Sequence, residues 1–204
     1  MKRPIYLFSD SQLLFWKEEA GYFTERFLPQ GKHTTAIKAA YIGASNGDNP
    51  DYFEIFRQAM QQIGVTTCLL ISSRPAIQDL EFLKMADIIL LAGGDVKLGW
   101  DVMLRNGVAE LIRNQYERGT TMVGISAGTI QLSLMGFDSN KQFDTFQLVP
   151  FIIDVHDEAN DWGRLSQIVT HNPGIKAYGI PFGAGLIYHP DGHVEMVRQP
   201  SMEF

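Results

Sequence analysis

The chain has 204 residues, of which 45% are hydrophobic and 20% are charged, and its formal net charge is −6 at neutral pH. This length favours one domain over residues 1–204 with a single core, and the composition excludes disordered, collagen-like and low-complexity chains. Because acidic residues outnumber basic ones and no basic cluster occurs, nucleic acids and anionic membrane surfaces are poor candidate partners. A small substrate is expected instead.

The cysteine content and the N-terminal segment indicate a cellular compartment. Cys68 is the only cysteine in the sequence, so an internal disulfide is excluded, which fits a reducing environment. The N-terminal segment reaches Ser9-Asp10-Ser11 before any long apolar run, and no run of 18 apolar residues follows. Neither a signal peptide nor a membrane span is therefore predicted, and a cytoplasmic protein is expected.

Short apolar runs alternate with segments of helical periodicity, which is typical of repeated β-α-β units. In chain order, strands are expected over 4–8, 39–44, 65–72, 87–92, 121–125 and within 146–155. Helices are expected over 52–63, 76–85, 108–118, from 127, and over 164–170, with a polar loop over 136–144. A turn-rich connection between 186–188 and 194–197 predicts an antiparallel hairpin. The pattern predicts an α/β fold of three layers, in which helices cover both faces of one mostly parallel sheet and a hairpin ends the chain.

The candidate nucleophile is Ser126, in the motif Gly124-Ile125-Ser126-Ala127-Gly128 between a predicted strand and a predicted helix. A sharp turn at such a junction exposes the serine side chain, and small neighbours are needed because the backbone is crowded. The amide that follows the serine would point toward a substrate carbonyl oxygen. The alternative interpretation is a tight turn that uses glycine for backbone reasons alone.

A second candidate position is Gly93-Gly94-Asp95, at the end of the preceding buried strand. Consecutive glycines let backbone N–H groups approach a ligand closely, and together with the Ala127 amide they could form an oxyanion hole. A phosphate-binding loop and a plain structural turn are the alternatives. Neither of the glycine-rich nucleotide-binding motifs is completed here, which disfavours the phosphate loop.

A serine hydroxyl needs a general base, and histidine exchanges protons near neutral pH. Of the five histidines, only His156 lies at the carboxyl end of a predicted strand close to Ser126 in the predicted sheet. A metal site at His189-x-Asp191-x-His193 is disfavoured because turn chemistry explains these residues. His156 is therefore the candidate base, and no metal is expected.

The sequence does not decide which residue provides the carboxylate that would orient His156. Asp138 and Asp144 lie in the predicted polar loop between the nucleophile and the base, and either could reach the histidine. Asp154 is near His156 in the chain, but residues on one strand point alternately to opposite faces, which weakens its case.

Taken in order, these motifs resemble the peptidase E and cyanophycinase type of serine peptidase, on a fold similar to class I glutamine amidotransferases. The resemblance rests on the following segments: Gly93-Gly94-Asp95, the Ser126 motif, Leu148-Val149-Pro150 through Asp154-Val155-His156, and Tyr178-Gly179-Ile180-Pro181 with Ala184-Gly185-Leu186-Ile187. It implies that Ser126 is the nucleophile, that His156 is the base, and that the amides of Gly93 and Ala127 bind the oxyanion. No metal or organic cofactor is implied.

For the third member of a triad, the resemblance favours Asp138, with Asp144 in reserve. Gly94, Asp95 and Arg164 are candidate substrate-binding residues. The family carries a basic stretch after the catalytic histidine, which suits an acidic substrate, whereas this chain keeps Arg164 alone among Asp157, Glu158 and Asp161. Specificity for an aspartyl residue is therefore implied by the resemblance and poorly supported by this segment.

The leading prediction is a serine peptidase that hydrolyses short peptides through an acyl-enzyme, similar to dipeptidase E, with aspartyl or isoaspartyl bonds as candidates and a monomer or homodimer as its state. One alternative is an esterase of the α/β-hydrolase type, in which the histidine lies farther along the chain. The other is an idle relative that binds a small molecule or peptide and would not need the pair of Ser126 and His156.

Overall fold

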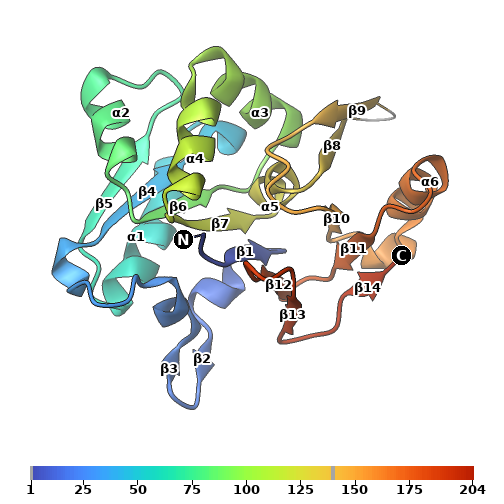
Figure 1. The fold of residues 1–204 in the computed structure, drawn as a ribbon, viewed down its shortest axis with the longest axis horizontal. Coiled ribbons are helices and arrows are strands. Elements are labelled where there is room, and N and C mark those ends of the chain that lie inside the picture. Colours follow the sequence, from blue (N-terminus) through green and yellow to red (C-terminus); the bar gives the residue numbers. More distant parts are fainter. Residues whose placement is uncertain (1, 139–140) are drawn as a thin grey trace.

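The computed structural model describes residues 2–138 and 141–204, and these residues form a central sheet of seven strands in the order β13-β12-β1-β7-β6-β4-β5 (Figure 1). The parallel strands are β1 (Ile5–Phe8), β7 (Thr121–Ile125), β6 (Ile88–Leu91), β4 (Lys38–Ile42) and β5 (Thr67–Ile71). Strand β12 (Gly185–Tyr188) pairs antiparallel with β1, and β13 (Val194–Val197) pairs antiparallel with β12. The predicted C-terminal hairpin is therefore confirmed.

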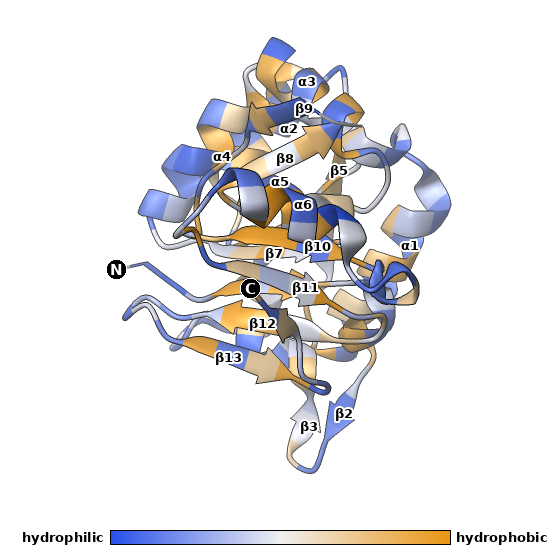
Figure 2. Cartoon of the chain, turned by 90° about the vertical axis from the view of Figure 1, so that its right-hand side faces the viewer, coloured by the Kyte–Doolittle hydropathy of each residue, from blue (hydrophilic) through white to orange (hydrophobic). Residues whose placement is uncertain are grey.

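Strand β1 shows why the parallel strands appear as uninterrupted apolar runs. Ile5 and Leu7 belong to the buried cluster on one face of the sheet, whereas Tyr6 and Phe8 belong to the cluster on the other face. Successive strand residues point to opposite faces, so a strand that is covered on both sides needs apolar residues at every position. Figure 2 shows the result, with hydrophobic strands inside and hydrophilic outer faces on the helices.

Helices cover both faces of the sheet, which confirms the three-layer prediction. One face packs against α2 (Ile77–Lys84), α3 (Val96–Arg105), α4 (Val108–Glu117) and α5 (Ala127–Leu132). The other face packs against α1 (Pro50–Gln62) and the 3-10 helices Ser11–Leu14 and Phe23–Phe27. Asn49 caps α1 by accepting a hydrogen bond from the Asp51 amide at 2.9 Å, and Pro50 fits the first helical position because its missing N–H has no partner there.

The strand predicted within 146–155 lies in a different sheet from the one expected. Strand β10 (Ile152–Val155) pairs in parallel with β11 (Ala177–Ile180), which pairs antiparallel with β14 (Met202–Glu203). The expected place in the main sheet was wrong because β1 and β6 already occupy both sides of β7. Helix α6 (Gly163–His171) covers the smaller sheet through a cluster that includes Trp162 and Leu165.

Some further elements differ from the sequence prediction. The expected polar loop forms a hairpin of β8 (Met135–Asp138) and β9 (Lys141–Asp144), and α3 was not predicted. A small hairpin of β2 (Lys17–Glu18) and β3 (Gly21–Tyr22) projects from the sheet. The remaining 3-10 helices are Thr34–Ala36, Ala44–Asn46 and Glu158–Asn160. Within the described residues, no helix has both the length and the apolar character that crossing a membrane requires.

Candidate active site

Ser126 occupies the junction between β7 and α5, as predicted. Its backbone has φ 49° and ψ −110°, and its amide donates a hydrogen bond to Phe8 O on the neighbouring strand at 2.9 Å. A positive φ is strained for a residue with a Cβ, and such residues gather at functional sites. The half-buried side chain of Ser126 therefore sits on a sharp turn that the adjacent strand holds in place.

The glycines around Ser126 are required by close contacts between α5 and the sheet. A Cβ at Gly128 would lie 2.1 Å from Leu91 O, and a Cβ at Gly124 would lie 2.7 Å from Thr129 Cα. Real Cβ atoms do not approach backbone atoms so closely, so a larger residue would push α5 away from β6 and β7. The small residues of the motif thus allow the turn to pack directly on the sheet.

The second glycine segment lies beside Ser126. A Cβ at Gly93 would be 3.3 Å from Ser126 Cβ, which places this residue against the serine. Gly94 has φ +133°, and a Cβ there would be 2.1 Å from Ser45 O, so only glycine fits. The exposed Asp95 caps α3 by accepting a hydrogen bond from the Leu98 amide at 2.8 Å. Its carboxylate therefore has a structural partner already.

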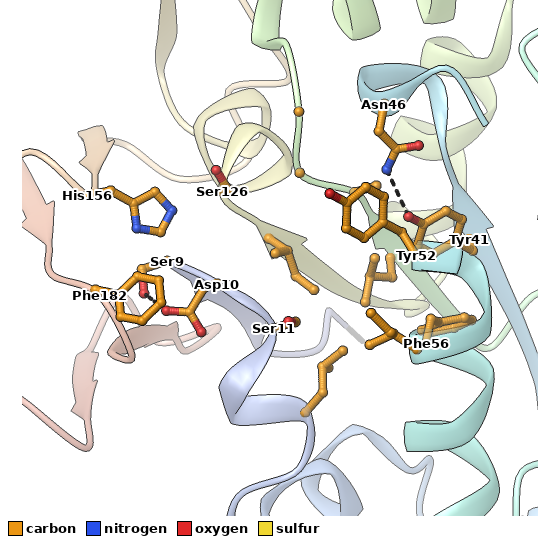
Figure 3. Close-up of a pocket in the computed structure, with 17 residues that line it drawn as sticks. Ser9, Asp10, Ser11, Tyr41, Asn46, Tyr52, Phe56, Ser126, His156 and Phe182 are labelled. Atoms are coloured by element: carbon orange, nitrogen blue, oxygen red, sulfur yellow. Dashed lines mark hydrogen bonds between the residues drawn. The ribbon is translucent and has the colours of Figure 1, made fainter. Parts of the chain in front are cut away.

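His156 follows β10 and also has a positive φ, 59°. Its amide donates to Ile180 O on β11 at 3.3 Å, and its exposed ring packs against Phe182 with 5.8 Å between the ring centroids. The histidine thus comes from the smaller sheet and the serine from the larger one. Figure 3 shows both side chains facing the same cavity.

Two cavities meet at the pair of Ser126 and His156. The larger has a volume of about 490 Å³, and Figure 3 shows Ser9, Asp10, Phe182 and His156 on one side of it, with Tyr41, Tyr52 and Phe56 across from them. The smaller has about 200 Å³ and is lined by Gly94, Ala127, Phe137 and Arg164 together with the same pair. The predicted nucleophile and base therefore stand where the two cavities join.

The structure does not bring the predicted carboxylates into these cavities. Asp138 lies at the exposed end of β8, next to Phe137, which lines the smaller cavity. Because neighbouring strand residues point to opposite faces, the Asp138 side chain points away from that cavity. Asp144 is exposed at the end of β9 and accepts a hydrogen bond from Gln147 Nε2 at 3.3 Å.

Arg164 is held by an acidic partner within the chain. Its Nε donates to Asp154 Oδ2 at 2.8 Å and its Nη2 donates to Oδ1, so the pair is bidentate. Asp154 is fully buried, and its hydrogen bonds raise the pKa of Arg164 above the usual value. Within the described residues, Nη1 makes no hydrogen bond, and the Arg164 side chain lines the smaller cavity.

Sequence reasoning missed Asp10, a carboxylate that lines the larger cavity with Ser126 and His156. It accepts hydrogen bonds from the amides of Gln12 (2.7 Å) and Gly183, and Ser9 Oγ lies 3.0 Å from its Oδ2. One signal could have found it: Asp10 follows β1, a parallel strand whose carboxyl end lies at the same edge as that of β7. Within the described residues, no cluster of three or more His, Cys, Asp or Glu side chains could hold a metal ion.

Similarity to known proteins covers almost the whole chain. The sequence profile of peptidase family S51 matches residues 7–196. Peptidase E of Haemophilus influenzae is 22% identical over 179 residues, which cover 79% of this chain and 80% of the relative. The pyridoxal 5'-phosphate synthase subunit PdxT of Thermococcus gammatolerans is 27% identical over 130 residues, which cover 63% of this chain and 60% of the relative.

Solved structures share the fold. A Listeria monocytogenes EGD-e protein that is named after peptidase E superposes with a TM-score of 0.72 at 18% identity, covering 98% of this chain and all of that one (100%). A peptidase from an acI-B1 Actinobacterium superposes with a TM-score of 0.68 at 16% identity, covering 100% of this chain and 94% of that one. These similarities confirm the expected glutamine amidotransferase-like α/β fold. With the family profile matching residues 7–196, the chain belongs to peptidase family S51 and is a serine-type peptidase.

Proposed function

We propose that the protein hydrolyses short peptides through an acyl-enzyme formed on Ser126. The observation that carries this proposal is the meeting of Ser126 and His156, two residues with strained positive-φ backbones, at the junction of two cavities. Strained residues on two separate sheets would not be expected to converge on one cavity without a functional reason. Serine as nucleophile and histidine as base form the simplest pair that this convergence supports.

The mechanism follows from the positions of these groups. Ser126 Oγ attacks the substrate carbonyl carbon while His156 accepts the hydroxyl proton, and the amides of Gly93 and Ala127 stabilise the negative oxygen that forms. His156 then donates the proton to the leaving amine, and the same base activates the water that releases the acyl group. Within the described residues, Ser126 and His156 are not yet hydrogen-bonded to each other. Such bonds commonly tighten only when the substrate binds.

For the carboxylate that orients His156, the cavity favours Asp10. Two backbone amides and a serine hydroxyl already fix this carboxylate, and a carboxylate has room for about four hydrogen bonds. Its partner Gly183 follows Phe182, which contacts the His156 ring. Asp138, which the resemblance favours, and Asp144 are the alternatives that substitution can test.

Gly94 and Arg164, which line the smaller cavity, are proposed to contact the leaving half of the peptide. Gly94 would contact the peptide through its backbone, and Arg164 would donate a hydrogen bond from Nη1, which Asp154 does not bind. Asp95 would act indirectly, because its cap on α3 holds the segment that follows Gly94.

The test is hydrolysis of a panel of dipeptides and tripeptides by the parent protein and by Ser126→Ala. We expect the variant to lose about 10⁴-fold or more in kcat/KM while its melting temperature stays within a few degrees. A serine-directed fluorophosphonate should label the parent at Ser126, as peptide mapping by mass spectrometry would show. Equal turnover by both proteins, or labelling at another residue, would contradict the proposal.

A further inference from the structure

The larger cavity is apolar on the side opposite His156 and Asp10. This apolar wall is formed by side chains from α1, β4, β7 and the 3-10 helix Ser11–Leu14: Leu14, Tyr41, Tyr52, Ile55, Phe56 and Ile125. Figure 3 shows that the labelled aromatic members of this wall stand opposite the catalytic pair. A volume of about 490 Å³ lies within the range of small-ligand sites and is large enough for an aromatic side chain.

The most buried polar group of this wall, the Tyr41 hydroxyl, already has a partner inside the protein. Asn46 Nδ2 donates to the Tyr41 hydroxyl at 3.0 Å, and the Tyr41 side chain is almost completely buried. Burial raises the pKa of Tyr41 to about 12, so its hydroxyl is neutral at physiological pH. The wall thus offers apolar surface, and the hydroxyl of Tyr41 adds no charge to it.

The charges of the larger cavity disfavour an acidic substrate side chain. Among the described residues that line it, none is lysine or arginine, and its one carboxylate is Asp10. A carboxylate that enters an apolar cavity without a cation loses hydration that nothing replaces, and Asp10 would repel it. Arg164 lies in the smaller cavity, on the other side of Ser126, and is paired with Asp154.

We propose that the larger cavity binds a bulky uncharged side chain, aromatic or branched aliphatic, of the residue whose carbonyl Ser126 attacks, and that it rejects an aspartyl residue there. This inference rests on the proposed function, since it names the substrate class of the same site. The placement of the two halves of the peptide follows from charge. The carboxylate of a short leaving group suits Nη1 of Arg164, which leaves the apolar cavity for the acyl residue.

Three isosteric substrates give the sharpest test, because leucine, asparagine and aspartate have side chains of nearly the same shape. We expect kcat/KM for Leu-Ala to exceed that for Asp-Ala by about 100-fold or more, with Asn-Ala between them and Phe-Ala at least equal to Leu-Ala. A preference for Asp-Ala over Leu-Ala would overturn the inference.

A variant can reverse the charge of the cavity. Ile55, which is half-buried on α1 and lines the wall, can be changed to lysine to supply the missing cation. We expect Ile55→Lys to narrow the ratio of Leu-Ala to Asp-Ala turnover by about tenfold or more. Tyr52→Arg, at a more exposed position of the same wall, should shift the ratio in the same direction if the lysine variant folds poorly. The matched control is Ile77→Lys, an exposed isoleucine of α2 outside the cavity, which should leave the ratio unchanged.

Inactivation by diphenyl phosphonates with Phe, Leu or Asp side chains separates this inference from the proposed function. We expect Ser126 to react fastest with the Phe and Leu compounds and at least about tenfold more slowly with the Asp compound. Reaction at Ser126 that is as fast or faster with the Asp compound would overturn the substrate class and leave the serine mechanism standing. No reaction with any compound, nor with the fluorophosphonate, would contradict the serine mechanism itself.

Discussion

The two residues of the proposed catalytic pair, Ser126 and His156, are held in different ways. The turn that carries Ser126 lies against the main sheet, where glycines let backbone meet backbone and Phe8 O accepts the Ser126 amide. The corner that carries His156 belongs to the small sheet, and its ring is exposed and packs on Phe182. The proposed nucleophile is therefore fixed by packing that leaves no room for an added atom at the neighbouring glycines, whereas the position of the proposed base depends on how the small sheet is attached.

Asp10 is the point where the two regions meet, so among the substitutions that test this comparison its replacement should have the largest effect on activity. It follows β1 of the main sheet and accepts the amide of Gly183, which follows β11 of the small sheet. We expect Asp10→Asn to lower kcat/KM by about 10³-fold to 10⁴-fold, because in the proposed triad Asp10 is the carboxylate that selects the tautomer of His156. Peptide hydrolysis measures this directly.

Asp138→Asn is the matched control for that experiment, since it removes the carboxylate that the resemblance favours. We expect a change of less than about threefold in kcat/KM, because Asp138 points away from the cavity. A large loss in Asp138→Asn together with a small one in Asp10→Asn would return the third position to Asp138.

Packing around the nucleophile predicts the largest effect on stability. In Gly128→Ala, the new methyl group would lie 2.1 Å from Leu91 O, so α5 must shift away from β6. We expect the free energy of unfolding to fall by about 2–4 kcal/mol, with a loss of fluorophosphonate labelling at Ser126. Urea unfolding followed by tryptophan fluorescence gives the first quantity.

The corresponding glycine near the base provides a contrast. A Cβ at Gly163, at the start of α6, would meet no atom within 4 Å. Gly163→Ala should therefore change the free energy of unfolding by less than about 1 kcal/mol and leave labelling of Ser126 intact. Equal destabilisation by the two substitutions would remove the contrast between the two regions.

The ion pair beside the smaller cavity predicts an intermediate effect. In Arg164→Met, the buried carboxylate of Asp154 loses its two charged hydrogen bonds. We expect the free energy of unfolding to fall by about 1–3 kcal/mol. This range already allows for the exposure of the arginine to solvent, which weakens the pair. The double variant Asp154→Asn with Arg164→Met removes the unpaired buried charge, so urea unfolding should show that part of the lost stability returns. If none returns, the unpaired carboxylate of Asp154 is not the cause of the loss.

The smallest effect concerns Cys68, on β5, far from both regions in the fold. Burial raises the pKa of its thiol to about 11, from an ordinary value of 9.0. Between these values the unfolded chain releases the thiol proton while the folded chain keeps it, so stability decreases as pH rises from about 9 to about 11. The free energy of unfolding is measured in urea at pH 8 and at pH 10.5 under reducing conditions. Between these two pH values, we expect it to decrease by about 1 kcal/mol less in Cys68→Ala than in the parent. An identical loss in both would exclude the thiol as the cause.

Local patterns predicted the parts of the fold that depend on neighbouring residues. The apolar runs identified the parallel strands, Asn49 and Pro50 marked the start of α1, and the small residues around Ser126 marked the turn. Helix α3 is continuous, but it was not predicted because Gly99, a poor helix former, lies within its sequence. A Cβ at Gly99 would lie 2.1 Å from Ser45 Oγ, so the glycine is required by a contact with a distant segment, which sequence periodicity does not show.

The two cavities bring together some of the predicted site residues and one that was not predicted. Ser126 and His156 were predicted because each follows a strand, and both line the cavities, whereas the position of Asp10 beside them depends on pairing between segments far apart in the chain. Arg164 was expected to face a substrate, and its pairing with Asp154 depends on how α6 folds back over β10. Long-range pairing decides such partners, and a single sequence does not display it.

The position of β1 has a consequence for the order of events during synthesis. Phe8 O accepts both the Ser126 amide and the Thr129 hydroxyl, and the next residue, Ser9, donates its amide to Ala184 O at 3.0 Å. Strand β12, which pairs with β1, is synthesised after Ser126 and therefore leaves the ribosome later than the serine does. We therefore expect nascent chains that have passed Ser126 to stay unreactive toward fluorophosphonate until the last strands have emerged. The proposed active centre would then form only after β1 has paired with both β7 and β12, so that a partly synthesised chain would not cleave peptides.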